Sequence, residues 1–302
     1  MVLAGFFASA ATQAAQGKLK VVATTSIIGD FLRVVGSDDL DLNVLVGPGG
    51  DPHEYEPVPS DSIRLARADL IFENGLGLET WLDKLCSSAQ THAIRVVVTD
   101  GIKIRHVLND EGRRPNSDAD DRDPHAWQNV ANAVIMVHNI ESALAKSDPA
   151  HAAGYKTRAA AYEVQLNELD DWVARMIHTI PPQQRKLVTS HDAFGYFGDR
   201  YGIDVSRSAL ESVTTEASDP SARQIVEVVK KIKSSGVPVI FVENVQNPRL
   251  IQQIAAEAHV AVGPPLYSDA LGPADSDGAT YLDMIRHNVA TLVNALKGSP
   301  AP

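Results

Sequence analysis

Residues 151–178 have the sequence HAAGYKTRAAAYEVQLNELDDWVARMIH, and this stretch determines how the rest of the chain is organised. Apolar or small side chains recur at alternating spacings of four and three residues, which places them on one stripe of a single α-helix. The stripe consists of Tyr155, Ala159, Tyr162, Leu166, Leu169, Val173 and Met176. At 1.5 Å per residue the helix would be about 42 Å long. Because a short stripe containing Tyr and Ala suits a helix laid along two lobes better than a coiled-coil dimer, we expect a monomer.

Short runs rich in β-branched residues lie on both sides of this helix, with amphipathic helical patterns between them. Such alternation predicts parallel α/β units with helices on both faces of each sheet. The predicted strands are Leu19–Thr24, Leu42–Val46, Asp69–Glu73 and Ile94–Thr99 before the helix, and Lys186–Ser190, Val205–Leu210, Pro238–Glu243 and Val260–Tyr267 after it.

The two sets of strands are similar in order and content, at an offset that drifts only slowly along the chain. The matched segments are Thr25-Ser26 with Thr189-Ser190, Asp51-Pro52 with Asp219-Pro220, Glu73-Asn74 with Glu243-Asn244, and Val98-Thr99-Asp100 with Tyr267-Ser268-Asp269. We therefore predict an α/β fold with two similar lobes of parallel sheet flanked by helices and joined by one long rigid α-helix. The expected boundaries are 18–148 for the N-terminal α/β lobe, 149–180 for the linking helix and 183–298 for the C-terminal α/β lobe.

The N-terminus and the composition limit the location and the partners. Residues 1–15 combine a short apolar run with a small-x-small pattern, which predicts the remnant of a signal peptide and a soluble periplasmic protein. The 302 residues include 27 Lys and Arg against 38 Asp and Glu, a net charge of −11, which argues against binding to nucleic acid or to anionic membranes. Because Cys86 is the single cysteine, an intrachain disulfide is excluded and a metal site would have to consist of His, Asp and Glu.

Four side chains lie in contexts that favour metal binding, and they are His53, His125, His191 and Asp269. His53 and His125 each follow an Asp-Pro pair, and Pro stiffens the chain before and at its own position. His191 and Asp269 follow predicted strands, at the carboxyl ends where parallel sheets bind ligands. A single loop histidine is more often a surface residue, so it is the joint pattern that indicates a site.

Three imidazoles and one carboxylate satisfy a tetrahedral divalent cation, with two ligands from each lobe. Four protein ligands leave no position for a reactive water, which favours holding a metal over hydrolysis. We therefore expect a binding protein and no enzyme. The alternative from another class is a secreted mononuclear zinc hydrolase, in which Glu54 is the only obvious general base.

The chain resembles the metal-binding receptors of zinc and manganese ABC importers, the cluster A-I solute-binding proteins. The stretches that carry the resemblance are Asp51–Pro57 (DPHEYEP), Asp123–Trp127 (DPHAW), Thr189–Phe197 (TSHDAFGYF), Val239–Asn244 (VIFVEN) and Leu266–Asp269 (LYSD). The resemblance implies two lobes with the metal between them, held by His53, His125, His191 and Asp269. It also implies delivery to a membrane permease with a cytoplasmic ATPase, and it leaves open whether a metallochaperone loads the site.

The identity of the metal rests on the third ligand position. Manganese-type members of the family generally carry Glu where this chain has His191. Nitrogen-rich, four-coordinate sites favour Zn²⁺, whereas bidentate binding by Asp269 would suit Mn²⁺. We expect zinc and keep a manganese receptor as the alternative. We also expect a flexible, solvated loop at 110–123, Trp127 beside the site, and structural roles for Glu73 and Glu243.

Overall fold

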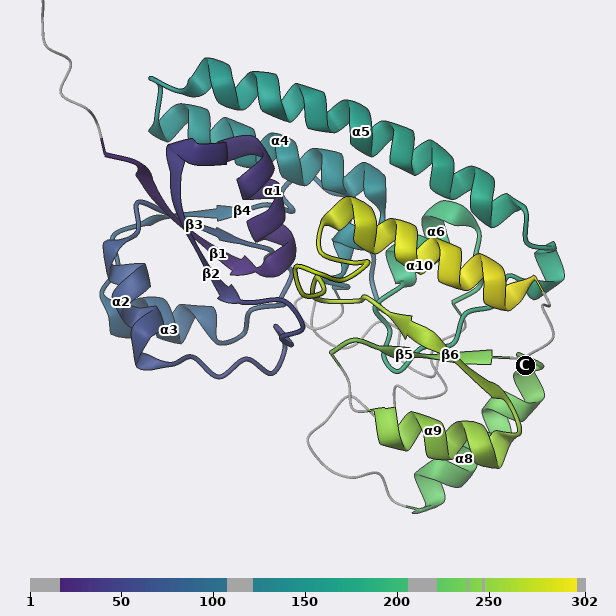
Figure 1. Ribbon diagram of the computed structural model, residues 1–302. Helices are drawn as coiled ribbons and strands as arrows, with labels where there is room; N and C mark the ends of the chain where they lie inside the picture. The colour runs from purple at the N-terminus through teal and green to yellow at the C-terminus, as the bar shows by residue number, and fades with distance from the viewer. Residues whose placement is uncertain (1–16, 108–121, 206–221, 238, 246–247, 298–302) are drawn as a thin grey trace, which may run out of the picture.

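The computed structural model describes residues 17–107, 122–205, 222–237, 239–245 and 248–297, so the predicted signal-peptide remnant lies outside the described residues. The predicted α/β architecture is confirmed: two lobes lie side by side beneath one long helix (Figure 1). The elements of the first lobe are β1 (Leu19–Thr25), α1 (Ser26–Gly36), η1 (Ser37–Asp39), β2 (Leu40–Val46), α2 (Pro59–Arg67), β3 (Leu70–Glu73), α3 (Leu82–Ala89), β4 (Ile94–Val97), η2 (Ala126–Gln128) and α4 (Val130–Ser147).

The first lobe contains a four-stranded parallel sheet in the order β2-β1-β3-β4. Residues 21–25 of the central strand β1 are all buried, as expected for a parallel strand covered on both faces. One face packs on α1 and α4, and the opposite face packs on α2 and α3 through a small core that includes Leu65, Ile71 and Leu82. At the carboxyl end of β1, Thr25 accepts a hydrogen bond from the N–H of Ile28 and starts α1.

The second lobe is less regular. Its elements, with the linking helix that precedes them, are α5 (Ala152–His178), η3 (Pro182–Gln184), α6 (Gly195–Tyr201), α8 (Ala222–Ser235), β5 (Val239–Glu243), α9 (Pro248–Ala258), β6 (Ala261–Leu266) and α10 (Tyr281–Leu296). Strands β5 and β6 form a parallel pair. Helices α8 and α9 cover one face through their own core, which includes Ile232, Ile240 and Ile254. Helix α10 lies over the other face, between the strands and α5 (Figure 1).

Two predicted strands of the second lobe differ from the structure. Lys186–Ser190 is not a regular strand: Lys186 forms an isolated parallel bridge with Asp204, and the Val188 carbonyl accepts from the N–H of Phe241. The hydroxyl of Thr189 donates to the His191 carbonyl over 2.7 Å, and such local side-chain bonds compete with a regular ladder. Of the predicted strand Val205–Leu210, residues 206–210 lie outside the described part of the chain.

The long helix predicted over His151–His178 is α5, which contacts α1 and α4 of the first lobe and α6 and α10 of the second. The predicted stripe is buried from Tyr155 to Val173, but its last buried member is Ile177 and not Met176. A helix with 3.6 residues per turn drifts by about 20° per heptad, so over three heptads the inward position moves one residue along the chain. None of the described helices combines the length and apolar character needed to cross a membrane.

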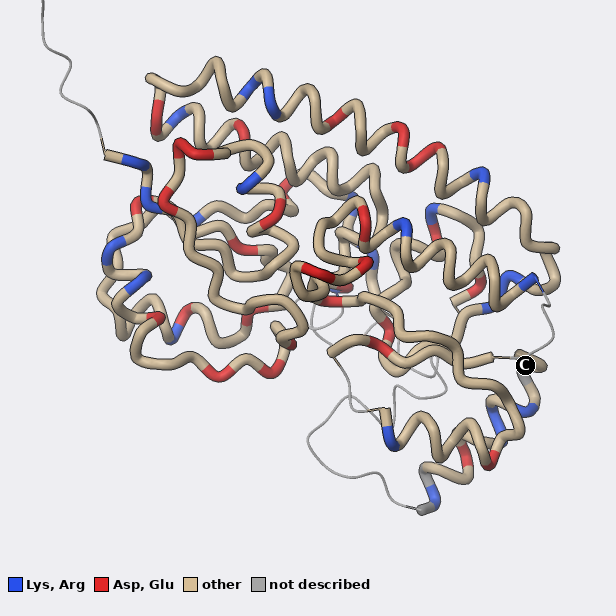
Figure 2. The backbone as a smooth tube through the Cα atoms, viewed as in Figure 1, with Lys and Arg blue, Asp and Glu red and all other residues tan. Residues whose placement is uncertain are grey.

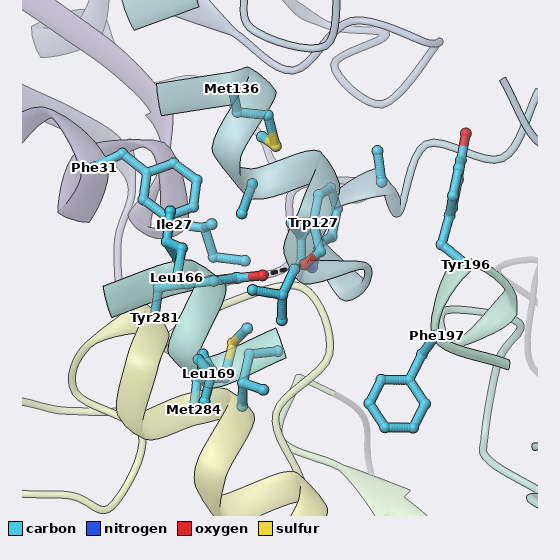
Figure 3. Close-up of a cluster of buried hydrophobic side chains, with 14 of the residues drawn as sticks. Ile27, Phe31, Trp127, Met136, Leu166, Leu169, Tyr196, Phe197, Tyr281 and Met284 are labelled. Carbon is cyan, nitrogen blue, oxygen red and sulfur yellow. Dashed lines mark hydrogen bonds between the residues drawn. The ribbon is translucent and has the colours of Figure 1, made fainter. Parts of the chain in front are cut away.

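One continuous hydrophobic core runs beneath α5 through both lobes (Figure 3). Phe31 of α1 and Tyr281 of α10 pack edge to face, with ring centroids 4.9 Å apart. The Tyr281 hydroxyl donates to the Trp127 carbonyl over 2.6 Å, and the Tyr281 N–H donates to Asp30 Oδ2 over 2.9 Å. This packing, on the α5 side of the molecule, fixes the lobes to each other. The candidate site lies in front of it, at the ends of the strands.

Candidate metal centre

His53 lies in the loop between β2 and α2. Its backbone N–H donates to Asp51 Oδ1 over 2.8 Å, which closes a turn around the Asp-Pro-His tripeptide. Trp81 Nε1 donates to the Pro52 carbonyl over 2.8 Å and attaches the loop to the start of α3. His53 is exposed, unlike the other three candidates, and therefore forms the solvent-facing side of the site.

His125 directly precedes η2 and is almost completely buried. Asp123 Oδ1 accepts from the His125 backbone N–H over 3.0 Å and lies 2.8 Å from His125 Nδ1. This contact occupies Nδ1 and turns Nε2 toward the other histidines. The expected flexible loop at 110–123 is wrong for Asp123, which is fully buried. Residues 110–121 of that loop lie outside the described residues.

The turn after His125 is attached to the segment that carries Asp269. Trp127 Nε1 and Gln128 Nε2 each donate to the Ser268 carbonyl over 2.8 Å. Trp127 also lies beside the site as expected, with its ring centroid 5.5 Å from that of His125. By sequence Asp269 belongs to the second lobe, but these bonds fix its position relative to the first.

His191 lies in the four-residue segment between the bridge segment 186–190 and α6. Glu243, the last residue of β5, holds it at two points: Glu243 Oε1 accepts from the His191 backbone N–H over 2.9 Å, and Oε2 lies 2.6 Å from His191 Nδ1. The hydroxyl of Ser190 also donates to Glu243 Oε1 over 2.7 Å. As at His125, a buried carboxylate lies beside Nδ1 and Nε2 faces the site, but here the close Nδ1–Oε2 contact is an ion pair without hydrogen-bond geometry.

The structure brings all four predicted residues together. Each offers one ligand atom, and these atoms all lie within 4.8 Å of one another. Nε2 of His53 is 3.2 Å from Nε2 of His125, and Nε2 of His191 is 3.0 Å from Asp269 Oδ2. Asp269 Oδ1 lies 3.4 Å from His125 Nε2. Such mutual approach of nitrogen and oxygen atoms is the arrangement around a single small cation.

The buried polar atoms of the cluster fit a cation better than they fit one another. Among the described residues, the buried atoms without a hydrogen-bond partner of acceptable geometry include His191 Nε2 and Asp269 Oδ1 within the site, and His191 Nδ1 and Glu243 Oε2 just behind it. Buried polar atoms without partners are costly and are concentrated at binding sites. A divalent cation would satisfy the two atoms within the site and would also offset the buried negative charge of Asp269.

The surroundings shift the pKa values of His53 and His191 in opposite directions. Although His53 is exposed at the outer side of the site, its Nε2 lies against His125; desolvation of the ring, followed by the charge of His125, lowers the pKa of His53 to about 4, so this imidazole is neutral at physiological pH. Burial alone would lower the pKa of His191, but the charges of Glu243 and Asp269 outweigh it and raise this pKa well above the ordinary value. Burial alone would raise the pKa of Asp269, but the neighbouring His191 outweighs it and lowers this pKa, so Asp269 stays ionised.

The sequence interpretation missed the two carboxylates that orient the histidines. We expected a structural role for Glu243, and the structure places it against His191; Glu73, its counterpart, pairs with Arg95 as a structural residue would. Asp123 was interpreted as part of the Asp-Pro pair before His125 and as one acid of a solvated loop, but not as the partner of the His125 ring. Its signal was the repetition of Asp-Pro-His, because in both copies the Asp accepts from the backbone N–H of the His two residues later.

Comparison with protein families gives a match to one family model, described as the periplasmic component A of zinc-uptake complexes, over residues 21–295. Among curated proteins, the manganese-binding lipoprotein MntA of Halalkalibacterium halodurans is 36% identical over 278 residues, which cover 92% of this chain and 88% of that protein. The manganese ABC transporter substrate-binding lipoprotein PsaA of Streptococcus mitis is 33% identical over 298 residues, with coverage of 96% and 93%.

Solved structures give the same architecture. The periplasmic zinc-binding protein TroA from Treponema pallidum superposes with a TM-score of 0.83 at 33% identity and covers 93% of this chain and 100% of that one. The manganese-bound periplasmic metal-binding protein from Candidatus Liberibacter asiaticus gives a TM-score of 0.79 at 29% identity, with coverage of 92% and 100%. Zinc and manganese thus both occur among the similar proteins.

Proposed function

Since the chain belongs to the family of periplasmic zinc-uptake components, which are substrate-binding receptors of ABC metal transporters, we propose that it captures Zn²⁺ with His53, His125, His191 and Asp269. In this proposal the protein delivers the ion to a membrane permease powered by an ATPase. The observation that carries the proposal is the convergence of three imidazoles and one carboxylate whose ligand atoms lie within 4.8 Å of one another.

The family consists of receptors and not of enzymes, so the chain is a binding protein and the secreted hydrolase is excluded. The expected location outside the cytoplasmic membrane is also that of the family. Lys and Arg are scattered over both lobes among acidic residues in the described part of the chain (Figure 2), unlike the basic surfaces that bind nucleic acid. Loading by a metallochaperone and a monomeric state stay predictions.

The donor set supports zinc as the ion. Three imidazole nitrogens and one carboxylate match the tetrahedral preference of Zn²⁺, and zinc lies above manganese in intrinsic affinity for such ligands. The buried carboxylates Asp123 and Glu243 support this geometry, because each fixes a ring so that Nε2 is the ligand atom. The manganese-binding relatives support the competing choice, in which Asp269 binds through both oxygens and raises the coordination number.

The test is the metal content of the purified protein, followed by competition of Zn²⁺ against Mn²⁺. We expect one equivalent of zinc in the wild type and a substantially weakened zinc affinity in His191→Glu. His138→Glu makes the same change of charge on the exposed face of α4 and should leave the affinity unchanged. Preference of the wild type for manganese would overturn the choice of metal, and no stoichiometric metal would overturn the four-residue site.

A further inference from the structure

Arg105 connects the two segments that carry the buried histidines. It lies in the segment after β4, and its Nη1 is 2.9 Å from Asp123 Oδ2 of the first lobe. The same Nη1 is 3.8 Å from Asp192 Oδ2, and Nε is 3.3 Å from Asp199 Oδ2, both in the second lobe. One planar guanidinium therefore reaches carboxylates of both lobes, a geometry that the point charge of a lysine does not reproduce.

The backbone of Arg105 makes the same connection. Its N–H donates to the Tyr196 hydroxyl of α6 over 2.9 Å, and its carbonyl accepts from the N–H of Asp123 over 2.9 Å. The guanidinium also lies against the first residue of α6, Gly195, where a Cβ atom would overlap with it. Arg105 is thus held in one place by both lobes, and the absence of a side chain at Gly195 makes the room for it.

In each lobe, one contact of Arg105 leads directly to a candidate ligand. On one side, Asp123 uses Oδ2 for Arg105 and Oδ1 for His125, so the guanidinium fixes the carboxylate that orients the ring. On the other side, Asp192 is the residue after His191 and is almost completely buried. The ring centroids of His125 and His191 are 5.2 Å apart, and Arg105 spans the backbone segments that set this separation.

We propose that Arg105 is a positioning residue of the metal site, which holds His125 and His191 at the separation that one ion requires. This inference rests on the proposed metal-binding function. Loss of the guanidinium frees the Asp123 carboxylate and loosens the segment of His191, so the ion is held by fewer well-placed ligands and leaves faster. Removal of a partner that orients a metal ligand typically lowers metal affinity by about 10–100-fold.

The sign of the effect distinguishes positioning from simple electrostatics. Arg105 carries a positive charge near a site for a cation, so Coulomb repulsion alone predicts that Arg105→Gln strengthens metal binding. The positioning role predicts the opposite. Arg105→Lys keeps the charge but loses the planar guanidinium that reaches carboxylates of both lobes. Gly195→Ala keeps Arg105 but displaces its guanidinium. Both should therefore weaken binding in the same direction as Arg105→Gln.

The experiment uses the full chain and measures zinc affinity by chelator competition, release by rapid mixing with excess chelator, and the visible spectrum of the Co²⁺-loaded protein. We expect Arg105→Gln, Arg105→Lys and Gly195→Ala each to weaken zinc binding by about 10–100-fold, mainly through faster release, and to alter the Co²⁺ spectrum. Arg95→Gln is the matched control, because Arg95 bridges Glu73 and Asp83 in the first lobe without contact to the site. It should change neither affinity nor spectrum.

Unchanged or tighter zinc binding in Arg105→Gln would overturn the inference, as would an equal loss in Arg95→Gln, which would indicate general destabilisation. If Arg105→Gln does not fold, Gly195→Ala tests the same contact by a milder change, and wild-type affinity in that variant would also overturn it. A wild type that takes up no stoichiometric zinc would instead overturn the proposed function, and this inference would fall with it. The two failures are therefore distinguishable.

Discussion

The two lobes contain matching segments that have different roles. In the first lobe, Thr25 ends β1 and Ser26 begins α1 at once, so Ile27 lies inside the helix and is buried in the core. In the second lobe, Thr189-Ser190 occupy the matching place, but α6 begins only at Gly195. The delay leaves His191, the counterpart of Ile27, outside any helix and next to Asp269. The later start of α6 thus makes the His191 side chain available as a ligand.

The carboxylates at the strand ends differ in the same way. Glu73 of β3 binds Arg95, with 2.7 Å between Arg95 Nη2 and Glu73 Oε2, and this cation is permanent. Glu243 of β5 faces His191, whose charge depends on protonation or on a bound metal. At this matched position the first lobe neutralises its carboxylate with an arginine of its own, whereas the second lobe leaves part of that task to an ion.

The largest effect should come from the pair Asp269 and Asp100, which match in the two lobes. Asp269→Ala removes the only anionic ligand of the four, which should weaken zinc binding by at least about 100-fold, since an uncompensated buried charge costs about 3–5 kcal/mol. Asp100 is exposed, so Asp100→Ala should change affinity by less than about twofold. Titration with a competing chelator measures both.

An equal loss of affinity in the two variants would break the comparison, because the matched position in the first lobe would then contribute to binding. Retention of tight binding in Asp269→Ala would show that the three histidines suffice and would remove Asp269 from the site.

A smaller effect should separate Glu243 from Glu73. Glu243→Gln keeps the shape but loses the charge that orients His191, and we expect about 10–100-fold weaker zinc binding. Glu73→Gln breaks a partly exposed pair with Arg95 and should cost about 1 kcal/mol of unfolding free energy or less, without changing affinity. Zinc titration combined with thermal unfolding of the metal-free protein tests both. Identical behaviour of the two variants would contradict the different uses of these carboxylates.

The sequence predicted the elements whose pattern is local and missed those that depend on partners far along the chain. The stripe of α5 was visible because its period belongs to one helix, and the shift from Met176 to Ile177 follows from helix geometry alone. The four candidate ligands were visible because each has a distinctive neighbour or lies at a strand end. The strand predicted at Lys186–Ser190 failed because the side chains of Thr189 and Ser190 bond locally and to Glu243.

The roles of Glu243 and Arg105 could not be predicted for a related reason. Glu243 and Glu73 each end an apolar strand and precede an Asn, and only the tertiary partner, His191 or Arg95, decides what each carboxylate does. Arg105 has no motif around it, and its contacts to Asp192 and Asp199 of the second lobe exist only once both lobes are in place. Pairings across lobes are set by packing, which local patterns do not record.

The smallest expected effect is the change in zinc affinity over a single pH unit. Because the pKa of His191 is raised, the metal-free protein keeps an imidazolium beside Glu243 and Asp269 up to a higher pH than an ordinary histidine would, whereas zinc requires the neutral ring. Zinc must therefore displace a proton, and its apparent affinity should fall about tenfold for each unit by which the pH drops below the raised pKa. The same raised pKa stabilises the metal-free fold below the ordinary histidine pKa, and this stabilisation is lost as the pH rises through the raised value.

Calorimetry in buffers of different ionisation enthalpy counts the protons released when zinc binds, and Glu243→Gln should release fewer because His191 then loses the charge that raises its pKa. A zinc affinity independent of pH around neutrality would mean that the second lobe, like the Arg95–Glu73 pair of the first, holds its charges without help from the ion.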